Sequence, residues 1–201
     1  MNLLAFDTVL NKTFITLTDG ATFESRTIES DEKNYHSAYL ISELKKLVPD
    51  FSKIDAIATN IGPGSFTGIR VCLTVANVMA AQLKIPLVGV SSVEVLAQLG
   101  SGQVFLDARR GDYIYYEATA APKLIKKDDA AAFVRNGAVC DTNCHTYFAA
   151  LGVETINFES GDYPLGEILA KIALEKFNTS GGESQLNPLY LQTPPVFIRS
   201  T

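Results

Sequence analysis

The chain has 201 residues, of which 47% are hydrophobic and 19% charged, and such a chain buries roughly 70% of its extended surface on folding. Its 22 acidic and 17 basic residues give a net charge of −5, which argues against a free-standing nucleic-acid-binding protein. The sequence contains neither an uninterrupted apolar run of about 18 residues nor a basic signal-peptide region, and its three cysteines suit a reducing compartment. We therefore expect a globular protein of the cytoplasm with no membrane span, whose low charge leaves apolar side chains that need a covering surface.

The first half of the chain changes from strand patterns to helix patterns after residue 30. Three strands are predicted at 3–6, 13–18 and 21–28, the last two joined by the hairpin turn Asp19-Gly20. Apolar residues at helical spacing then predict a helix over 35–48, which Pro49 ends. The elements expected next are a strand over 54–59, a glycine-rich loop over 62–68, a helix to about residue 83, a strand over 85–90 and a capped helix over 93–99.

The second half begins with a similar pattern, because 104–107 repeats the apolar strand ending in Asp that is found at 3–7. The elements expected after it are strands over 112–119 and 122–125, a helix over 128–134, a strand over 138–140, a helix from about 143, a strand at 155–156 and a helix over 165–177. A β-β-β-α-β-α unit written twice is the layout of a duplicated RNase H-like, actin-like α/β fold. We expect domains of 1–101 and 102–201, the second one reduced, with the last helix able to return to the first.

The glycine-rich loop and the helix start after it, 62–70, have two interpretations. Free backbone N–H groups and the positive end of a helix could bind an anion there. No known phosphate loop fits, however, because no lysine lies between Lys53 and Lys84 and the G-x-G-x-x-G spacing fails by one residue. A serine elbow would need glycine where Pro63 and Thr67 stand. The other interpretation is a tight strand-to-helix turn.

The helix after this loop has no polar side. Ten of the thirteen residues in 71–83 are apolar, and no charge occurs between Arg70 and Lys84. A helix that is apolar all round is covered on both sides, either within its own chain or by a partner. We favour a protein interface.

Asp7 and Asp107 each end a predicted strand, which is where α/β folds place their ligands. They could position Mg²⁺ or a phosphate-bound water, or they could simply cap turns. Arg109-Arg110, directly after Asp107, could contact a phosphate or form the polar tip of a hairpin.

A metal site is not expected. Cys140, Cys144 and His145 lie close together in sequence, but a zinc site needs more ligands and the only other histidine is His36. With Leu40 four residues after His36, no His-x-x-x-His pair exists, so acid–base catalysis also has few candidates.

The chain resembles the TsaB (YeaZ) family. The segments that carry the resemblance are 4–8, 35–37, 62–70, 85–92, 106–111 and 188–191, while 120–185 matches only loosely. Where the family often has Asp-Thr-Ser after the first strand, this chain has Asp7-Thr8-Val9, which weakens the case for a nucleotide site of its own.

The resemblance implies a non-catalytic partner of TsaD in forming N6-threonylcarbamoyladenosine at position 37 of tRNA (t6A37), with the ATPase TsaE completing the complex. TsaD carries a His-x-x-x-His metal motif that is missing here, so neither a metal nor a cofactor of its own is expected. A nucleotide at the junction with TsaD stays open, and Asp7 and Asp107 would be vestigial cofactor-binding residues. Strong tRNA binding by this chain alone is not expected.

In the family, two helices of the first domain bind TsaD, and the same face pairs two copies when TsaD is absent. The resemblance places this face on the helices at 35–48 and 66–83. The residues expected in it are Tyr35, His36, Tyr39, Leu40, Phe66, Ile69, Arg70, Leu73, Val75, Ala76, Val78 and Met79. The alternative is an enzyme acting alone, either an ATPase that uses Asp7 and Asp107 or a peptidase. The missing lysine, histidine pair and serine elbow favour the scaffold.

Overall fold

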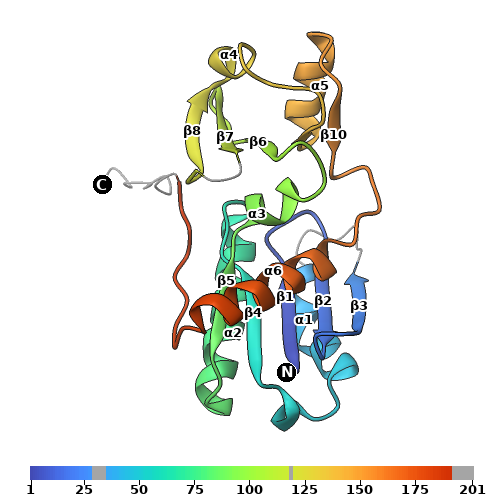
Figure 1. The fold of residues 1–201 in the computed structure, drawn as a ribbon, viewed down its shortest axis with the longest axis vertical. Coiled ribbons are helices and arrows are strands. Elements are labelled where there is room, and N and C mark those ends of the chain that lie inside the picture. Colours follow the sequence, from blue (N-terminus) through green and yellow to red (C-terminus); the bar gives the residue numbers. More distant parts are fainter. Residues whose placement is uncertain (29–34, 118–119, 192–201) are drawn as a thin grey trace, which may run out of the picture.

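The computed structural model describes residues 1–28, 35–117 and 120–191, and for residues 35–38 the backbone alone. It contains two five-stranded sheets, one above the other along the long axis of the molecule (Figure 1). The described residues therefore form a mixed α/β fold in two halves, each with its own sheet, as the sequence predicts.

The first sheet has the strand order β3-β2-β1-β4-β5. β1–β2 and β2–β3 are antiparallel, whereas β4 and β5 join β1 in parallel register. The hairpin between β2 and β3 turns at Asp19, whose Oδ1 accepts hydrogen bonds from the backbone N–H groups of Ala21 and Thr22. The strands are β1 Leu3–Asp7, β2 Thr13–Thr18, β3 Phe23–Ile28, β4 Ala56–Asn60 and β5 Leu87–Val90.

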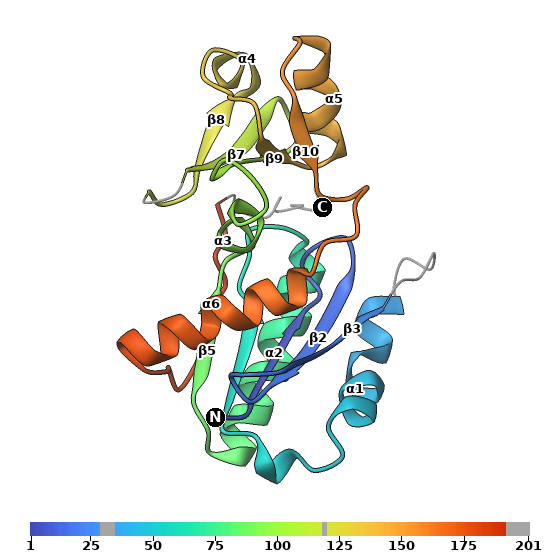
Figure 2. The same ribbon diagram turned by 45° about the vertical axis from the view of Figure 1, so that its right-hand side comes forward.

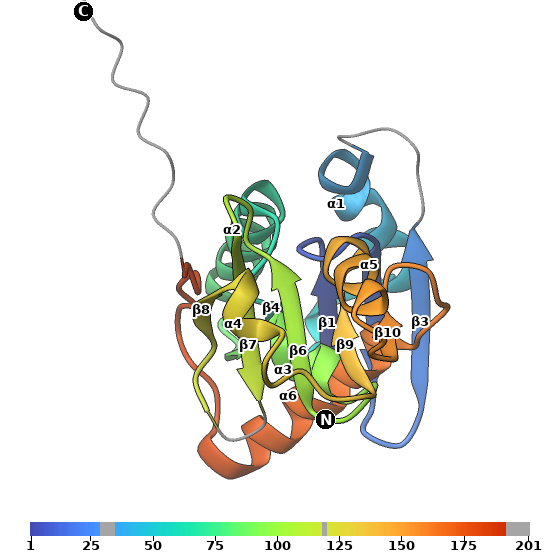
Figure 3. The same cartoon turned by 90° about the horizontal axis from the view of Figure 1, so that it is seen from above.

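Helices cover both faces of this sheet, which is why β1 and β4 are buried along their whole length. Helices α1 (Tyr35–Leu47) and α2 (Phe66–Leu83) lie on one face, and α6 (Leu165–Ser180) lies on the other (Figures 2 and 3). A short 3₁₀ helix, η1 (Phe51–Lys53), follows α1, and α3 (Ser92–Ala97) follows β5.

Helix α6 follows the second sheet in the chain but packs on the first, against β1, β2 and β5. Leu165, Leu169, Ala170 and Ala173 form its buried side in a core shared with Leu3 and Ala5. The unit built around the first sheet therefore includes 165–180 as well as the N-terminal half, and a division of the chain at residue 101 would separate the sheet from one of its covering helices.

The second sheet has the order β10-β9-β6-β7-β8, which repeats the topology of the first. Its hairpin strands are antiparallel and β6, β9 and β10 are parallel. Its elements are β6 Gln103–Asp107, β7 Asp112–Glu117, β8 Lys123–Lys126, α4 Lys127–Ala130, β9 Ala138–Cys140, α5 Thr142–Ala150 and β10 Thr155–Asn157. The predicted duplicated, actin-like layout is confirmed. The predicted helix at 128–134 is wrong in length, because α4 ends at Ala130 and Phe133 turns toward the rings of Phe105 and Tyr115.

The two sheets share one core. A single cluster of buried residues includes Leu3 and Val90 from the first sheet and Val104 and Val139 from the second, together with residues of α3 and α6. An ion pair between Glu94 of α3 and Lys176 of α6 (2.8 Å) ties the two connecting helices together. The two sheets are therefore joined by direct packing of buried apolar side chains.

Helix α2 alone among the described helices is long and apolar enough to cross a membrane, judged by length and composition only. Its inner side, formed by Gly68, Ile69, Cys72, Leu73, Ala76 and Ala80, is buried in the protein, packed on the first sheet. Its apolar character is therefore divided between the core and an outer surface.

Candidate functional site

The glycine-rich loop forms a tight turn between β4 and α2. The backbone N–H of Gly62 donates to Asn60 Oδ1 (2.8 Å), and that of Ser65 donates to the carbonyl of Val9 (3.2 Å). A Cβ on Gly68 would lie 2.0 Å from the carbonyl oxygen of Thr8, so this position accepts no side chain. Ser65 Oγ accepts from the Gly68 N–H and caps α2. These contacts are those of a tight strand-to-helix turn.

Asp7 is a buried connector at the end of β1. Its side chain is 1% exposed, Oδ1 accepts from the Val9 N–H (2.5 Å) and Oδ2 accepts from Asn60 Nδ2 (2.7 Å). Asn60 Oδ1 in turn accepts from Gly62 N and from Ser92 Oγ (2.9 Å), which links β1, β4, the glycine loop and α3. Burial raises the pKa of Asp7 to about 6, against the opposing effect of the Asn60 and backbone hydrogen bonds. Both oxygens of the carboxylate are thus used inside the protein.

Asp107 occupies the matching place at the end of β6 but is partly exposed. Its Oδ1 accepts from the Arg109 N–H (2.7 Å) and its Oδ2 from Asn143 Nδ2 (2.8 Å). Arg109 and Arg110 form the exposed tip of the β6–β7 hairpin, both with positive φ. Within the described part of the chain, Asp7 and Asp107 share no hydrogen-bond partner, so the structure places each in a network of its own.

The cysteine and histidine residues of the second half lie on β9 and in the first turn of α5. Cys140 and Cys144 are buried, and burial raises the pKa of the Cys140 thiol to about 12. His145 Nδ1 lies 2.7 Å from Thr155 Oγ1. No group of three or more His, Cys, Asp or Glu side chains that could hold a metal ion occurs among the residues described.

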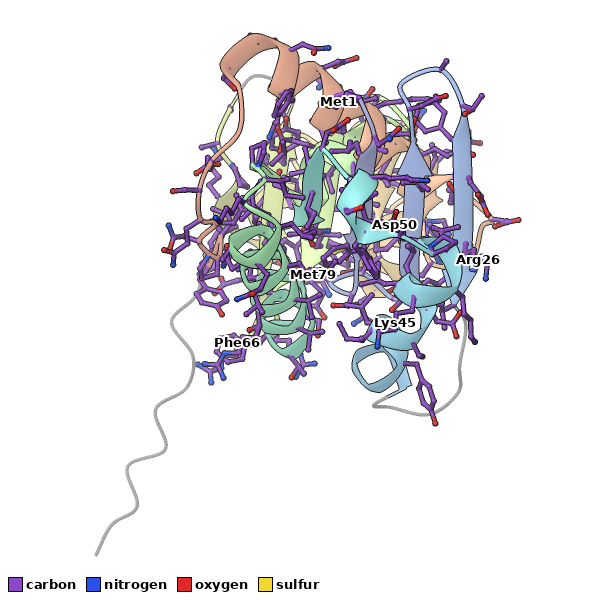
Figure 4. All side chains as sticks on the ribbon, turned by 90° about the horizontal axis from the view of Figure 1, so that it is seen from below. Met1, Arg26, Lys45, Asp50, Phe66 and Met79 are labelled. Atoms are coloured by element: carbon purple, nitrogen blue, oxygen red, sulfur yellow. The ribbon has the colours of Figure 1, made fainter. Side chains whose placement is uncertain are left out.

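An apolar groove of about 260 Å³ runs between α1 and α2. Figure 4 shows these helices side by side, with Met79 and Lys45 labelled on the two sides of the groove. Its lining consists of Ile41, Leu44, Lys45, Phe51, Val78, Met79, Gln82 and Leu83. Around it, Val78 is 58% exposed and Tyr39 and Ile41 are each 44% exposed, unusually open for large apolar side chains. We call this groove and its exposed rim the α1–α2 surface.

The twelve residues expected in a partner face fall into three sets. Tyr39, Phe66, Arg70, Val75, Val78 and Met79 are exposed or partly exposed. For four others the expectation is corrected, because their side chains are at most 7% exposed and are part of the core. These residues are Leu40, Ile69, Leu73 and Ala76. The side chains of Tyr35 and His36 lie outside the described part of the chain.

Sequence reasoning missed part of the groove. Ile41 follows Leu40 in the helical pattern but points outward, and Phe51 enters from η1 after the helix has ended. Gln82 and Leu83 extend the α2 side by one turn beyond Met79. Leu83 continues the buried stripe of α2, seven residues after Ala76, so helical spacing could have found it, but only the packing of η1 could reveal Phe51.

A second cluster lies at the N-terminal end of α2. The guanidinium of Arg70 lies 3.9 Å from the centre of the Phe66 ring, and Tyr190 stacks on the same ring with centroids 5.1 Å apart. Tyr190 comes from the segment after α6, which runs back along β5 and α2. We call residues 181–191 the C-terminal strap.

Two sheets of identical topology with a strand-end acid in each define a duplicated actin-like, RNase H-like α/β protein. Residues 33–141 match the family model described as TsaD: tRNA N6-adenosine threonylcarbamoyltransferase. This match covers more than half of the chain, so the chain belongs to this family, and its relatives within the family are TsaB (YeaZ) proteins.

The relatives agree with the resemblance seen in the sequence. The tRNA threonylcarbamoyladenosine biosynthesis protein TsaB of Bacillus subtilis is 35% identical over 120 residues, which is 55% of this chain and 52% of that protein. The protein of the same name from Escherichia coli is 37% identical over 71 residues, 32% of this chain and 31% of that protein. The chain therefore spans about half or less of the length of the curated relatives it matches.

Among solved structures, YeaZ from Pseudomonas aeruginosa superposes with a TM-score of 0.76 at 21% identity, covering 94% of this chain and 100% of that one. A Pseudomonas aeruginosa protein described as similar to peptidase YEAZ gives the same TM-score at 23% identity, covering 95% and 99% of the two chains. These similarities establish the fold.

Proposed function

We propose that the chain is a non-catalytic subunit in the formation of t6A37 in tRNA, and that its α1–α2 surface binds a TsaD protein. The names of the Bacillus subtilis and Escherichia coli relatives support a role in this modification. The observation that carries the docking proposal is the apolar groove between α1 and α2, with Val78 58% exposed at its edge. Apolar surface concentrated in this way on one face is characteristic of a binding site for another protein.

The strand-end acids support a scaffold rather than an ATPase. An ATPase of this fold would need carboxylates that reach a nucleotide-bound cation, whereas Asp7 is 1% exposed and bonded to Asn60 and to the backbone. A peptidase would need an activated nucleophile, whereas Ser65 of the glycine loop caps α2 through its hydroxyl oxygen. Both observations favour the non-catalytic role.

The proposal extends to the partners expected from the family. Two copies of the chain pair through the α1–α2 surface when TsaD is absent, and TsaE completes the complex. The chain has no cofactor of its own, and any nucleotide binds at the junction with TsaD. A net charge of −5 fits a subunit that does not bind tRNA strongly by itself and leaves that contact to its partner.

Replacing Val78 with lysine tests the docking proposal. Val78→Lys places a charge in the middle of the apolar surface, and a face of ordinary size, roughly 1,200–2,000 Å² in total, would not tolerate it. We expect the variant to lose complex formation with the TsaD protein of the same organism, measured by size-exclusion chromatography with light scattering. The same variant should also lose any homodimer.

Leu151→Lys is the matched control, because Leu151 is a similarly exposed apolar residue (51%) at the end of α5, in the second half of the fold. This variant should form the complex like the wild type, and both variants should keep the wild-type circular dichroism spectrum. A Val78→Lys variant that still forms an undiminished complex would refute the proposal.

A further inference from the structure

The cluster of Phe66, Arg70 and Tyr190 is held in place by the C-terminal strap. The strap pairs with β5 through reciprocal hydrogen bonds between Leu87 and Glu183, each 2.8 Å. It is then clamped to α2 at Leu186, whose N–H donates to Asn77 Oδ1 (2.9 Å) and whose carbonyl accepts from Asn77 Nδ2 (3.1 Å).

The last fixed point of the strap lies beside the glycine loop. The Leu189 N–H donates to the carbonyl of Ile61 (2.8 Å), one residue before Tyr190. Leu186 is 4% exposed and belongs to the core beneath α2. With these contacts on either side of it, the strap is built into the fold, and the position of Tyr190 on Phe66 is set by the backbone.

Arg70 is the one charged residue of α2. Its side chain is exposed, and no carboxylate of the described residues lies within 4.0 Å of its guanidinium. The contact with Phe66 restricts the position of the guanidinium, and the exposure of the side chain leaves N–H donors accessible. A guanidinium held in this way is prepared for a bidentate contact with a carboxylate.

Position adds a second argument. Val78, about two turns further along α2, is exposed on the same side as Arg70 and lines the groove, and no other charge occurs before Lys84. A partner that covers this side also removes water from Arg70, and an arginine buried without a counter-charge is strongly unfavourable. The partner therefore needs an acid at this end of its own apolar face, and the pair would fix the direction in which it binds.

We propose that Phe66, Arg70 and Tyr190 form a second anchor of the partner surface, in which Arg70 binds a carboxylate of the partner and the C-terminal strap becomes part of the interface. This inference rests on the proposed docking of TsaD. It adds the polar contact that selects and orients the partner.

The affinity of Arg70 variants for the TsaD protein of the same organism tests the inference. By isothermal titration calorimetry we expect Arg70→Glu to raise the Kd about tenfold or more. Arg70→Lys should raise the Kd by a smaller factor, because lysine keeps the positive charge but cannot make the bidentate contact of a guanidinium. Tyr190→Ala should also weaken binding, because the stack that supports Phe66 is lost. Arg70→Ala should bind with a weaker dependence on salt than the wild type, a change that a purely structural role would not produce.

Arg26→Glu is the matched control, since it makes the same charge change at an exposed position of β3, on the other side of α1 (Figure 4). If Val78→Lys abolishes binding while Arg70→Glu binds like Arg26→Glu, this inference is overturned and the docking proposal stands. If the wild type forms no complex with TsaD, both are overturned. If Arg70→Glu keeps its affinity for TsaD but the complex loses tRNA, the guanidinium serves a phosphate and the carboxylate assignment is wrong.

Discussion

At the scale of single residues, Asp7 shows how an acid at the end of a strand can serve the fold. Its carboxylate bonds to Asn60, which lies 53 residues further along the chain, and Asn60 passes the connection to Gly62 and Ser92. The cost of burying a charge appears as a pKa raised to about 6. The same residue type at the same strand end can thus bind a ligand in one protein and support a turn in another.

The raised pKa of Asp7 makes stability depend on pH in a defined direction. In the folded state the carboxyl titrates at about 6, against 3.8 as the reference value, so the folded protein holds this proton more tightly. The contribution of this tighter proton binding to the unfolding free energy is fully present below pH 3.8 and is lost as the pH rises through 6. Relative to Asp7→Asn, the wild type should therefore lose about 2 kcal/mol of unfolding free energy between pH 4 and pH 7, measured by urea denaturation.

Asp128→Asn, which removes an exposed carboxyl on α4, serves as the control and should leave the pH profile of the wild type unchanged. A wild type and an Asp7→Asn variant with parallel profiles from pH 4 to pH 7 would show that Asp7 titrates normally. The sequence could place Asp7 at the end of a strand from the apolar run before it. It could not predict the enclosure of the carboxyl group, because its side-chain partner Asn60 comes from β4, 53 residues away.

At the scale of elements, α2 has three roles along one helix. Its inner stripe fills the core, its outer side borders the apolar groove, and Asn77 between them holds the C-terminal strap. An apolar helix with the amide of Asn77 in its middle is therefore not simply a core helix. The amide is the point where a distant segment of the chain is attached.

Asn77→Ala should release the strap. Both hydrogen bonds to the backbone of Leu186 would be lost, which leaves two partly buried backbone groups unsatisfied and should lower the unfolding free energy by about 1–3 kcal/mol. Limited proteolysis followed by mass spectrometry should then show faster cleavage within 181–191.

Gln82→Ala is the control on the same helix, because Gln82 lines the groove and is exposed but makes none of the described contacts with the strap. Cleavage of the Asn77→Ala strap at the rate of the Gln82→Ala variant would mean that Leu186 is held by packing alone.

The bounds of most helices and strands follow from local sequence patterns, whereas their arrangement relative to one another in the fold does not. Alternation predicts β2 over 13–18 correctly, and the apolar run after the glycine-rich loop predicts a helix that ends near residue 83, as α2 does, because both patterns are local properties. Expecting both Ile69 and Val78 in one face was wrong, since they lie on opposite sides of α2. The attachment of the strap at Asn77 was not predictable, because it joins positions 109 residues apart.

At the scale of the whole molecule, two sheets of the same topology share one core, and an apolar groove between α1 and α2 lies open at the surface. The shared core runs through α3 and α6, so the sheets are packed together rather than joined by linkers alone. Much of the apolar content noted in the composition fills the buried clusters of the two sheets, while Tyr39, Ile41 and Val78 of α1 and α2 stay exposed beside the groove. A molecule built in this way suits a subunit that supports a partner.

The most direct test of this account is a t6A formation assay on tRNA. The reaction contains the TsaD protein of the same organism, threonylcarbamoyl adenylate and TsaE, and the wild-type chain or the Val78→Lys variant is added to it. The account predicts no t6A from the wild-type chain alone, efficient formation when it is combined with TsaD, and loss of that formation with Val78→Lys but not with Leu151→Lys. Full modification with Val78→Lys, or t6A formed by this chain without TsaD, would contradict it.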